Sequence, residues 1–431
     1  MDRNVIKQVI VDQKEILLRE PYIRREQGLE SGINYCFVGI RRAGKSFILY
    51  QMIHDFLERG GAENQFTYIN FEDERLLEMK TSDLNTVVEI AHEFSGPGFK
   101  PLLFLDEIQN IEGWDKFSRR MADMKYRISI TGSNSKMLSS EIASTLGGRF
   151  MIREIYPYSF REFISAKGTI QINQMQTTEW KATVISLFKE FLSFGGFPEL
   201  PGINDKRAYL SNLFKTVFLG DIIVRNAVSN PFALRLMIKK MAESIMAPLS
   251  FSRLSNIISS SGVPVGKSTV IKYVDYAKDS FLIFGISNYA AKLSDKETVP
   301  KYYFTDQGLD ALFISDPSSR QLENTVAVEL MRRYGKDNVF FFQDSNFEVD
   351  FFIPDEGLAI QVCMALNMDD GTLKRETNAL VKLKSFIHDI DCLILTADEE
   401  SNLTVKDVDI RILPVWKWLL HIGKNSRIIT P

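Results

Sequence analysis

Residues 39–46 read Gly-Ile-Arg-Arg-Ala-Gly-Lys-Ser, which matches every fixed position of a phosphate-binding loop. Gly39 and Gly44 allow the backbone to curve with its N–H groups turned toward an anion. Lys45 can reach the β- and γ-phosphates of a nucleotide, and the Ser46 hydroxyl can bind Mg²⁺. We therefore predict that ATP is contacted by Gly39, Ile40, Arg41, Arg42, Ala43, Gly44, Lys45, Ser46 and Phe47.

Two acidic residues, Asp106 and Glu107, follow directly after the apolar residues 101–105. At this place in a phosphate-loop protein, Asp106 would hold Mg²⁺ through its water shell, and Glu107 would orient or deprotonate the attacking water. Many strands end in acidic residues, so the pair alone is a weak signal. The complete phosphate loop upstream favours the catalytic interpretation. Together the two segments predict magnesium-assisted hydrolysis of ATP.

Three further residues are candidates for sensing the γ-phosphate. Ser133 and Asn134 follow a predicted strand at residues 127–131 and could lie between the two halves of the site. The alternative is that they cap a helix that begins at residue 135. Arg149, just before a predicted strand, could pair with the transferred phosphate in the same chain or from a neighbouring subunit. The alternative interpretation is that Arg149 is an ordinary arginine on the protein surface.

The elements that must position these residues follow an α/β pattern. An apolar strand at residues 35–38 enters the loop, and helical spacing of apolar residues at 47–57 leaves it. The loop thus opens a helix whose N-terminus faces the anion. Further strands are expected at residues 66–70, 101–105 and 127–131, with a helix near residues 84–94.

These motifs and several later ones occur in a recognisable order. The first part of the chain carries the loop at 39–46, Phe-Leu-Asp-Glu-Ile-Gln at 104–109, Thr-Gly-Ser-Asn at 131–134, Gly-Gly-Arg-Phe at 147–150 and Tyr-Pro-Tyr-Ser-Phe-Arg-Glu-Phe at 156–163. Later come Phe-Gly-Gly-Phe-Pro-Glu at 194–199, Leu-Gly-Asp-Ile at 219–222, Tyr-Phe-Thr-Asp-Gln-Gly-Leu at 303–309 and Glu-Val-Asp-Phe at 348–351. Over nearly its whole length the chain resembles prokaryotic AAA+-type ATPases that carry a C-terminal domain of unknown function.

The resemblance implies an ATPase fold at residues 1–160, with magnesium and catalytic acids at Asp106 and Glu107. It also implies the γ-phosphate sensor near Ser133 and Asn134, and a counterpart of the family's arginine at Arg149. The family's biological role is poorly defined, so the resemblance does not give the pathway. Residues 161–247, which read as successive helices, suit the helical lid that AAA+ proteins place over the nucleotide.

Residues 248–315 read as a winged helix: two short helices joined by a turn, then an apolar strand. The turn contains Gly-Lys-Ser at 266–268, but a helix rather than a buried strand precedes it, so we read it as a turn and a helix start. Lys267, Lys272 and Lys278 on the second helix could contact DNA phosphates. Asp275 and Asp279 on the same helix weaken its positive field, and protein–protein packing is the alternative.

Residues 316–431 have the helix and strand order of restriction-type nucleases, which place an acid on the first helix, an aspartate on the second strand and Glu-x-Lys on the third. Glu323 or Glu329 could supply the first acid and Asp350 the second. The third strand carries Gln361 and Cys363 instead of the glutamate and the lysine. We therefore expect a nuclease-like domain that does not cleave nucleic acid.

Composition limits the class of protein further. The chain has 431 residues, a formal net charge of −3 and three scattered cysteines. This length predicts several domains, and the cysteines suggest a reduced, cytoplasmic protein without a disulfide framework. No stretch is apolar enough to cross a membrane. We expect an α/β, AAA+-like ATPase that uses ATP and Mg²⁺ to rearrange its domains or an unknown protein partner, with DNA as a candidate partner of the winged helix. The alternatives are an ATP-gated nuclease and a nucleotide switch that does not hydrolyse.

Overall fold

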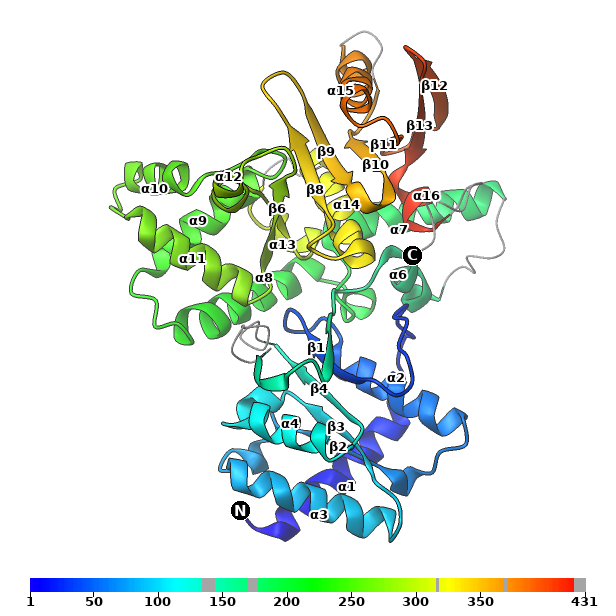
Figure 1. Cartoon of the computed structure of the whole chain (residues 1–431), viewed down its shortest axis with the longest axis vertical. Coiled ribbons are helices and arrows are strands. Elements are labelled where there is room, and N and C mark those ends of the chain that lie inside the picture. Colours follow the sequence, from blue (N-terminus) through cyan, green and yellow to red (C-terminus); the bar gives the residue numbers. More distant parts are fainter. Residues whose placement is uncertain (134–143, 169–176, 315–317, 367–370, 422–431) are drawn as a thin grey trace. The chain divides into compact units, whose positions relative to one another are not determined.

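The computed structural model describes residues 1–133, 144–168, 177–314, 318–366 and 371–421 (Figure 1). It divides into two compact units, each described here by itself. The first unit is Met1–Tyr156 with Asp279–Phe281, and the second is Pro157–Lys278 with Leu282–Pro431. Asn134, one of the predicted sensor residues, lies outside the described residues.

The first unit is built on a parallel sheet of five strands in the order β2-β3-β4-β1-β5 (Figure 1). The strands are β1 (Asn34–Val38), β2 (Phe66–Asn70), β3 (Leu102–Asp106), β4 (Ile128–Gly132) and β5 (Phe150–Glu154). The side chains of β1 to β4 are largely buried, as expected for a parallel sheet covered on both faces, whereas those of the edge strand β5 are mostly half-buried. The strand predicted at 127–131 is present, and β4 lies between β1 and β3.

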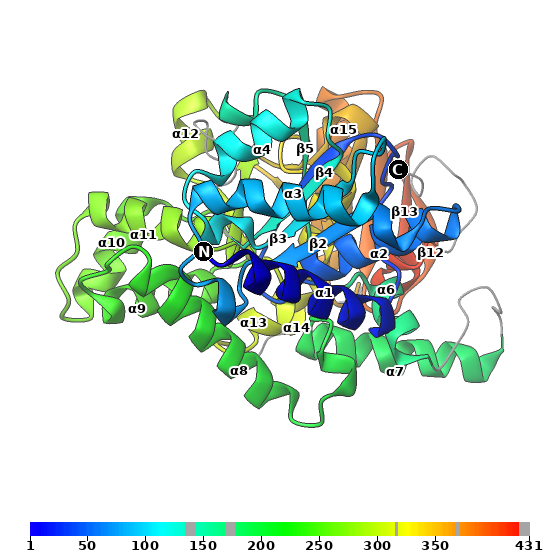
Figure 2. The same cartoon turned by 90° about the horizontal axis from the view of Figure 1, so that it is seen from below.

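In the described residues, the helices that accompany this sheet include α1 (Arg3–Arg19), α2 (Lys45–Glu58), α3 (Leu84–Ser95) and α4 (Trp114–Asp123). Their apolar residues recur at helical spacing, as in α3, which buries Leu84, Val87, Ile90 and Ala91. Helices α1 and α3 lie side by side, and α1 also packs on β2 (Figure 2). The short 3₁₀ turns of this unit are η1 (Glu63–Gln65), η2 (Glu74–Leu76), η3 (Thr81–Asp83) and η4 (Ile108–Asn110).

The second unit begins with helices, in agreement with the helical reading of residues 161–247. They are α6 (Phe160–Lys167), α7 (Thr178–Phe194), α8 (Lys206–Thr216) and α9 (Pro231–Glu243), with η6 (Leu200–Gly202) between α7 and α8. After α8 the chain continues as a π-helix, η7 (Val217–Val224), which the sequence reading treated as ordinary helix. Whether this segment covers the nucleotide remains a prediction.

Next come α10 (Phe251–Ser260) and α11 (Lys267–Asp279), then β6 (Ile283–Asn288), α12 (Leu293–Thr298), β7 (Lys301–Phe304) and α13 (Gln307–Asp310). The Gly-Lys-Ser at 266–268 leads from a turn into α11, so the reading as a helix start is confirmed. Strands β6 and β7 form an antiparallel hairpin.

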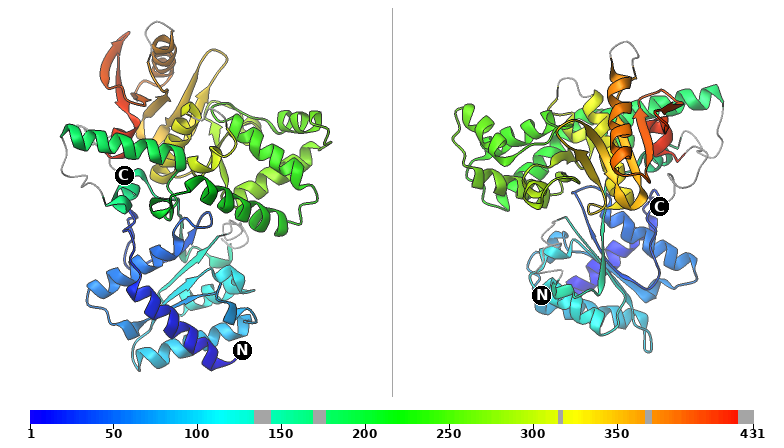
Figure 3. Two further views of the ribbon diagram at one scale, coloured as in Figure 1. Left: turned by 180° about the vertical axis from the view of Figure 1, so that it is seen from behind. Right: turned by 45° about the horizontal axis from the view of Figure 1, so that its top comes forward.

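The last part of the chain forms α14 (Ser318–Tyr334), β8 (Phe340–Gln343), β9 (Glu348–Ile353), η8 (Pro354–Glu356), β10 (Leu358–Val362), α15 (Thr372–Phe386), β11 (Asp391–Thr396), β12 (Ser401–Val405), β13 (Val408–Pro414) and α16 (Val415–Leu419). Helix α15 packs along β9, β10 and β13 (Figure 3). The sheet has eight strands in the order β12-β13-β11-β10-β9-β8-β6-β7.

This order joins two regions that we expected to be separate domains. Strand β6 pairs in parallel with β8 through Ser287 opposite Phe340. The hairpin of the region 248–315 is therefore continuous with the sheet of the region 316–431. Within the described residues, no helix is long and apolar enough to cross a membrane.

Candidate functional site

The phosphate loop connects the end of β1 to the start of α2, where we expected it. Gly39 has φ of +150°, and a Cβ added to it would lie 2.2 Å from the carbonyl oxygen of Ile155. Gly44 also has a positive φ, of +94°. A larger residue at either position would be strained, and at Gly39 it would also collide with the chain that follows β5. The loop's shape therefore depends on both glycines.

The loop is braced by an arginine that the sequence reading did not single out. The Arg25 side chain is buried and donates to the carbonyl of Ala43 (2.9 Å) and to that of Tyr156 (2.7 Å). Gln51 on α2 in turn holds the backbone of Arg25, through bonds of 2.7 and 3.3 Å. Arg25 therefore links the loop at Ala43 to the chain that follows β5.

Lys45 lies at the centre of the site. Its Nζ donates to the carbonyl oxygens of Gly39 and Ile40, both at 3.3 Å, and lies 3.5 Å from Glu107 Oε1. The lysine side chain is only 4% exposed, so its charge is concentrated on a few oxygen partners. Phosphate oxygens are stronger partners for an ammonium group than carbonyl oxygens, so a nucleotide can take over these contacts.

Asp106 is fully buried at the end of β3 and is held from both sides. Tyr68 on β2 donates its hydroxyl to Asp106 Oδ2 (2.7 Å), and Thr131 on β4 donates to Oδ1. Burial and the charge of Glu107 raise the pKa of Asp106, whereas the hydroxyls of Thr131, Ser46 and Tyr68 oppose that rise. The structure therefore brings together Ser46 and Asp106, the two residues predicted to hold magnesium.

Glu107 has an unusual backbone conformation for its residue type, with φ of +50°. Its N–H donates to Thr131 Oγ1 (2.9 Å), and its Oε2 accepts from Gln109 Nε2 (2.5 Å). Burial would raise the pKa of Glu107, but the charge of Lys45 and the contacts with Gln109 and Ser133 lower it overall. Glu107 is therefore ionised at neutral pH, as a residue that orients or deprotonates water must be.

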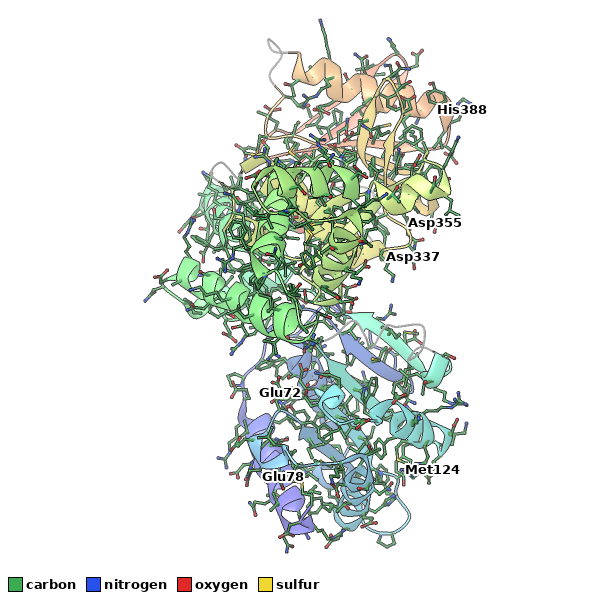
Figure 4. All side chains as sticks on the ribbon, turned by 90° about the vertical axis from the view of Figure 1, so that its left-hand side faces the viewer. Glu72, Glu78, Met124, Asp337, Asp355 and His388 are labelled. Atoms are coloured by element: carbon green, nitrogen blue, oxygen red, sulfur yellow. The ribbon has the colours of Figure 1, made fainter. Side chains whose placement is uncertain are left out.

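The remaining predicted nucleotide contacts surround this centre. Ile40 and Ala43 are buried and bonded to each other through the backbone (3.2 Å). Arg41 Nη1 lies 3.2 Å from Glu72, which follows β2 (labelled in Figure 4). Arg42 has φ of +66°, and the ring of Phe47 contacts that of Tyr50.

The two candidate sensors in the described residues differ in their surroundings. Ser133 is buried beside Glu107, whose pKa it helps to lower. Arg149 instead pairs with Asp123 of α4 and donates to the carbonyl of Gly147 (3.2 Å). Neither of these contacts involves the phosphate loop, so the role of Arg149 stays a prediction.

The residues present fit a magnesium–nucleotide complex. A lysine, loop N–H groups, one hydroxyl and one carboxylate are the usual protein contributions, because Mg²⁺ keeps several waters and binds phosphate oxygens. Across the described residues, no three His, Cys, Asp or Glu side chains form a self-sufficient metal site. Tyr68 and Arg25 were missed because each acts from a distant segment and no local motif marks them. Thr131 and Gln109 belong to the motifs at 131–134 and 104–109, but the sequence reading assigned them no role.

Some of the acidic residues that we predicted to lie together in the terminal region do so. Of the two candidates on α14, Glu323 lies in the same cluster as Asp350, whereas Glu329 pairs with Arg333 (2.8 Å) and Arg332 (3.3 Å). Gln361, at the place of the missing glutamate, accepts from Asp350 N (2.8 Å) and donates to the carbonyl of Glu348 (3.1 Å).

The remaining predicted residues belong to the third nuclease-like strand and to the second helix of the winged helix. Cys363 is half-buried, and burial raises the pKa of its thiol to about 12. Lys267 and Lys272 are exposed on α11. Lys278 is half-buried, and its Nζ lies 5.6 Å from the centre of the Tyr302 ring.

The fold and the site define the first unit as a P-loop ATPase domain of the AAA type. The sequence family described as AAA domain matches residues 34–164, and a domain of unknown function, DUF8612, matches residues 185–318. The second match spans part of the predicted lid and the whole of the predicted winged helix.

Two relatives match nearly the full chain. Uncharacterized protein MJ1544 of Methanocaldococcus jannaschii is 32% identical, over 97% of this chain and 96% of that protein. An uncharacterized protein of Haemophilus influenzae is 31% identical, over 95% of this chain and all of that protein. The chain belongs to the family of these proteins.

Similar solved structures include the Walker-type ATPase PABY2304 of Pyrococcus abyssi, at 13% identity and a TM-score of 0.38, covering 72% of this chain and 95% of that one. Another is Cdc6p from Pyrobaculum aerophilum, at 13% identity and a TM-score of 0.26, covering 76% and 98%.

Proposed function

We propose that the protein binds ATP with Mg²⁺, hydrolyses it and uses the cycle to rearrange its own domains or a partner. One observation carries the proposal: Lys45, Ser46, Asp106 and Glu107 converge in one buried cluster between the ends of β1 and β3. Glu107, ionised and next to the lysine, favours hydrolysis over a switch that only binds nucleotide.

Each residue has a distinct task in this proposal. The loop N–H groups and Lys45 hold the β- and γ-phosphates, while Ser46 and Asp106 hold the metal directly or through its waters. When bound, Mg²⁺ would offset the negative charge on the phosphates. Glu107 orients the attacking water and accepts its proton. Ser133 and Asn134 sense the γ-phosphate, and Arg149 stabilises its charge during transfer.

The second unit supplies the parts that could respond to the nucleotide. We assign residues 161–247 to a helical lid, 248–315 to a winged helix and 316–431 to a nuclease-like domain without cleavage activity. Two helices joined by a turn and followed by the β6–β7 hairpin support the winged helix. Free thiols at Cys36, Cys363 and Cys392 fit a reducing compartment such as the cytoplasm.

DNA is a second candidate partner, because Lys267 and Lys272 are exposed on α11, the second helix of the helix–turn–helix. Helices in this position commonly contact DNA. The net charge of −3 means that such binding depends on a local patch rather than on the whole surface.

Titration of ATP–Mg²⁺ into the full chain by calorimetry tests the nucleotide site. Lys45→Ala should abolish measurable binding, because the phosphates lose their buried counter-charge. Lys7→Ala, which changes an exposed lysine of α1 in the same unit, is the matched control and should bind normally. Unchanged affinity in Lys45→Ala would refute the proposed site.

A further inference from the structure

A lysine is buried among acidic groups in the second unit. Lys301 begins β7, and its side chain has no exposed surface. Its Nζ lies 2.6 Å from Glu348 Oε1, 3.6 Å from Asp350 Oδ1 and 3.7 Å from Glu323 Oε1. The three carboxylates come from β9 and α14, whereas the lysine comes from the β6–β7 hairpin. Side chains from three segments that are far apart in the sequence therefore meet at one point.

Lys301 offsets part of the negative charge of this cluster, and burial raises the pKa of Glu323, its most deeply buried acid, to about 8. Each carboxylate also accepts one uncharged hydrogen bond: from Gln343 Nε2 to Glu348 (2.8 Å), from Val362 N to Asp350 (2.8 Å) and from Tyr303 OH to Glu323 (2.7 Å). Burial alone would lower the pKa of Lys301, but the three carboxylates outweigh it and raise that pKa, so the lysine is charged at neutral pH. The Phe341 ring lies 5.3 Å from Nζ and adds a cation–π contact.

The cluster lies beside an open cleft of about 540 Å³. Glu348 and Asp350 line this cleft and keep 28% and 17% of their side chains exposed. Carboxylates gathered at a cleft in this way are oxygen ligands suited to a divalent cation. Gln361, which also lines the cleft, does not add a charge, because its amide is bonded to the backbone of β9.

We propose that the Lys301 ammonium occupies the place of a divalent metal ion in a carboxylate site of the nuclease type. The cleft consequently binds no metal there, and the domain performs no metal-dependent cleavage of nucleic acid. This role is independent of the ATPase activity proposed above. It also explains why an ion pair that is costly to bury is built into the junction of the hairpin and the terminal sheet.

Mn²⁺ binding to the full chain without nucleotide, counted by electron paramagnetic resonance of the free ion, tests this role. Wild type and Asp350→Asn should bind the same number of ions. Lys301→Met keeps the length of the side chain but removes its charge, and it should gain one Mn²⁺ together with a Mn²⁺-dependent rise in melting temperature. Adding Asp350→Asn to Lys301→Met should abolish both gains.

The matched control is Lys382→Met, which removes a cation that lines the same cleft and donates to the Asn346 carbonyl (3.4 Å). It should gain no ion. The proposal fails if Asp350→Asn costs wild type one Mn²⁺, or if folded Lys301→Met gains none. If Lys301→Met does not fold, the comparison of wild type with Asp350→Asn still decides: equal binding supports the proposal and a lost site overturns it.

Discussion

At the scale of single residues, the proposed catalytic acid pair depends on side chains from neighbouring strands. Asp106 and Glu107 share one partner, Thr131, whose hydroxyl donates to Asp106 and accepts from the Glu107 N–H. Tyr68 fixes the other oxygen of Asp106. Burial raises the pKa of Tyr68 well above its usual value, so its hydroxyl keeps the proton that it donates. These contacts orient Asp106 before any nucleotide arrives.

Removing the Tyr68 hydroxyl should therefore weaken the use of magnesium. In Tyr68→Phe, we expect the Mg²⁺ concentration for half-maximal ATP binding to rise several-fold, since one lost hydrogen bond to a charged group is worth about 1.5–3 kcal/mol. Calorimetric titrations at several Mg²⁺ concentrations measure this. Tyr126→Phe, which removes a hydroxyl bonded to His92 in the same unit, is the control and should behave as wild type.

Arg149 is predicted to stabilise the transferred phosphate. Arg149→Ala should lower ATP turnover by about tenfold or more and leave ATP affinity unchanged. Arg119→Ala is a matched control, because Arg119 also lies close to Asp123 (3.9 Å). Activity per molecule that rises with protein concentration would place the arginine in a neighbouring subunit. Equal turnover in Arg149→Ala and Arg119→Ala would remove Arg149 from the mechanism.

At the scale of elements, two sequence motifs of the second unit contact each other and form one junction between helices. The Gly-Gly of residues 195–196 ends α7, and Asp306 precedes α13. The Asp306 carboxylate accepts from Gly196 N (2.7 Å) and from Gly308 N (2.8 Å). A Cβ on Gly195 would lie 1.8 Å from Asp306 Oδ1, and Gly195 has φ of +81°. The motifs at 194–199 and 303–309 therefore fit one another.

Gly195→Ala should destabilise the protein by about 3 kcal/mol or more, because it adds a collision to a left-handed conformation. Thermal or urea unfolding measures the loss. Gly202→Ala is the control: Gly202 ends η6, and nothing lies within 4 Å of its added Cβ. If the two variants are equally stable, the junction has room for the extra methyl group, and the close packing that we infer for Gly195 is wrong.

Local patterns predicted the elements well but not their long-range pairing. The strand expected at 66–70 is β2, and the helix expected near 84–94 is α3. Both depend on apolar spacing that a short segment displays in full. The pairing of β6 with β8, the cluster around Lys301 and the brace at Arg25 depend on tertiary contacts between distant segments. No spacing within a segment encodes these contacts, so the sequence reading missed them.

At the scale of the whole molecule, any DNA binding should be modest and sensitive to salt. Lys267→Ala with Lys272→Ala should lower the slope of log affinity against log salt by about two, one for each lost phosphate contact. Fluorescence anisotropy with duplex DNA at several salt concentrations measures the slope. Lys215→Ala with Lys239→Ala, at exposed positions on other helices, is the control. Tight binding that survives both high salt and the first double change would exclude the α11 patch.

The central claim is that the cluster around Glu107 hydrolyses ATP, and a single-turnover experiment tests it most directly. Wild type and Glu107→Gln, each in excess over radiolabelled ATP–Mg²⁺, are quenched over time and the bound nucleotide is identified. Glu78→Gln, which changes an exposed glutamate of the same unit, is the control (Figure 4). We predict that wild type and Glu78→Gln convert bound ATP to ADP, while Glu107→Gln binds ATP and leaves it intact. Conversion by Glu107→Gln at the wild-type rate would contradict this account of the site.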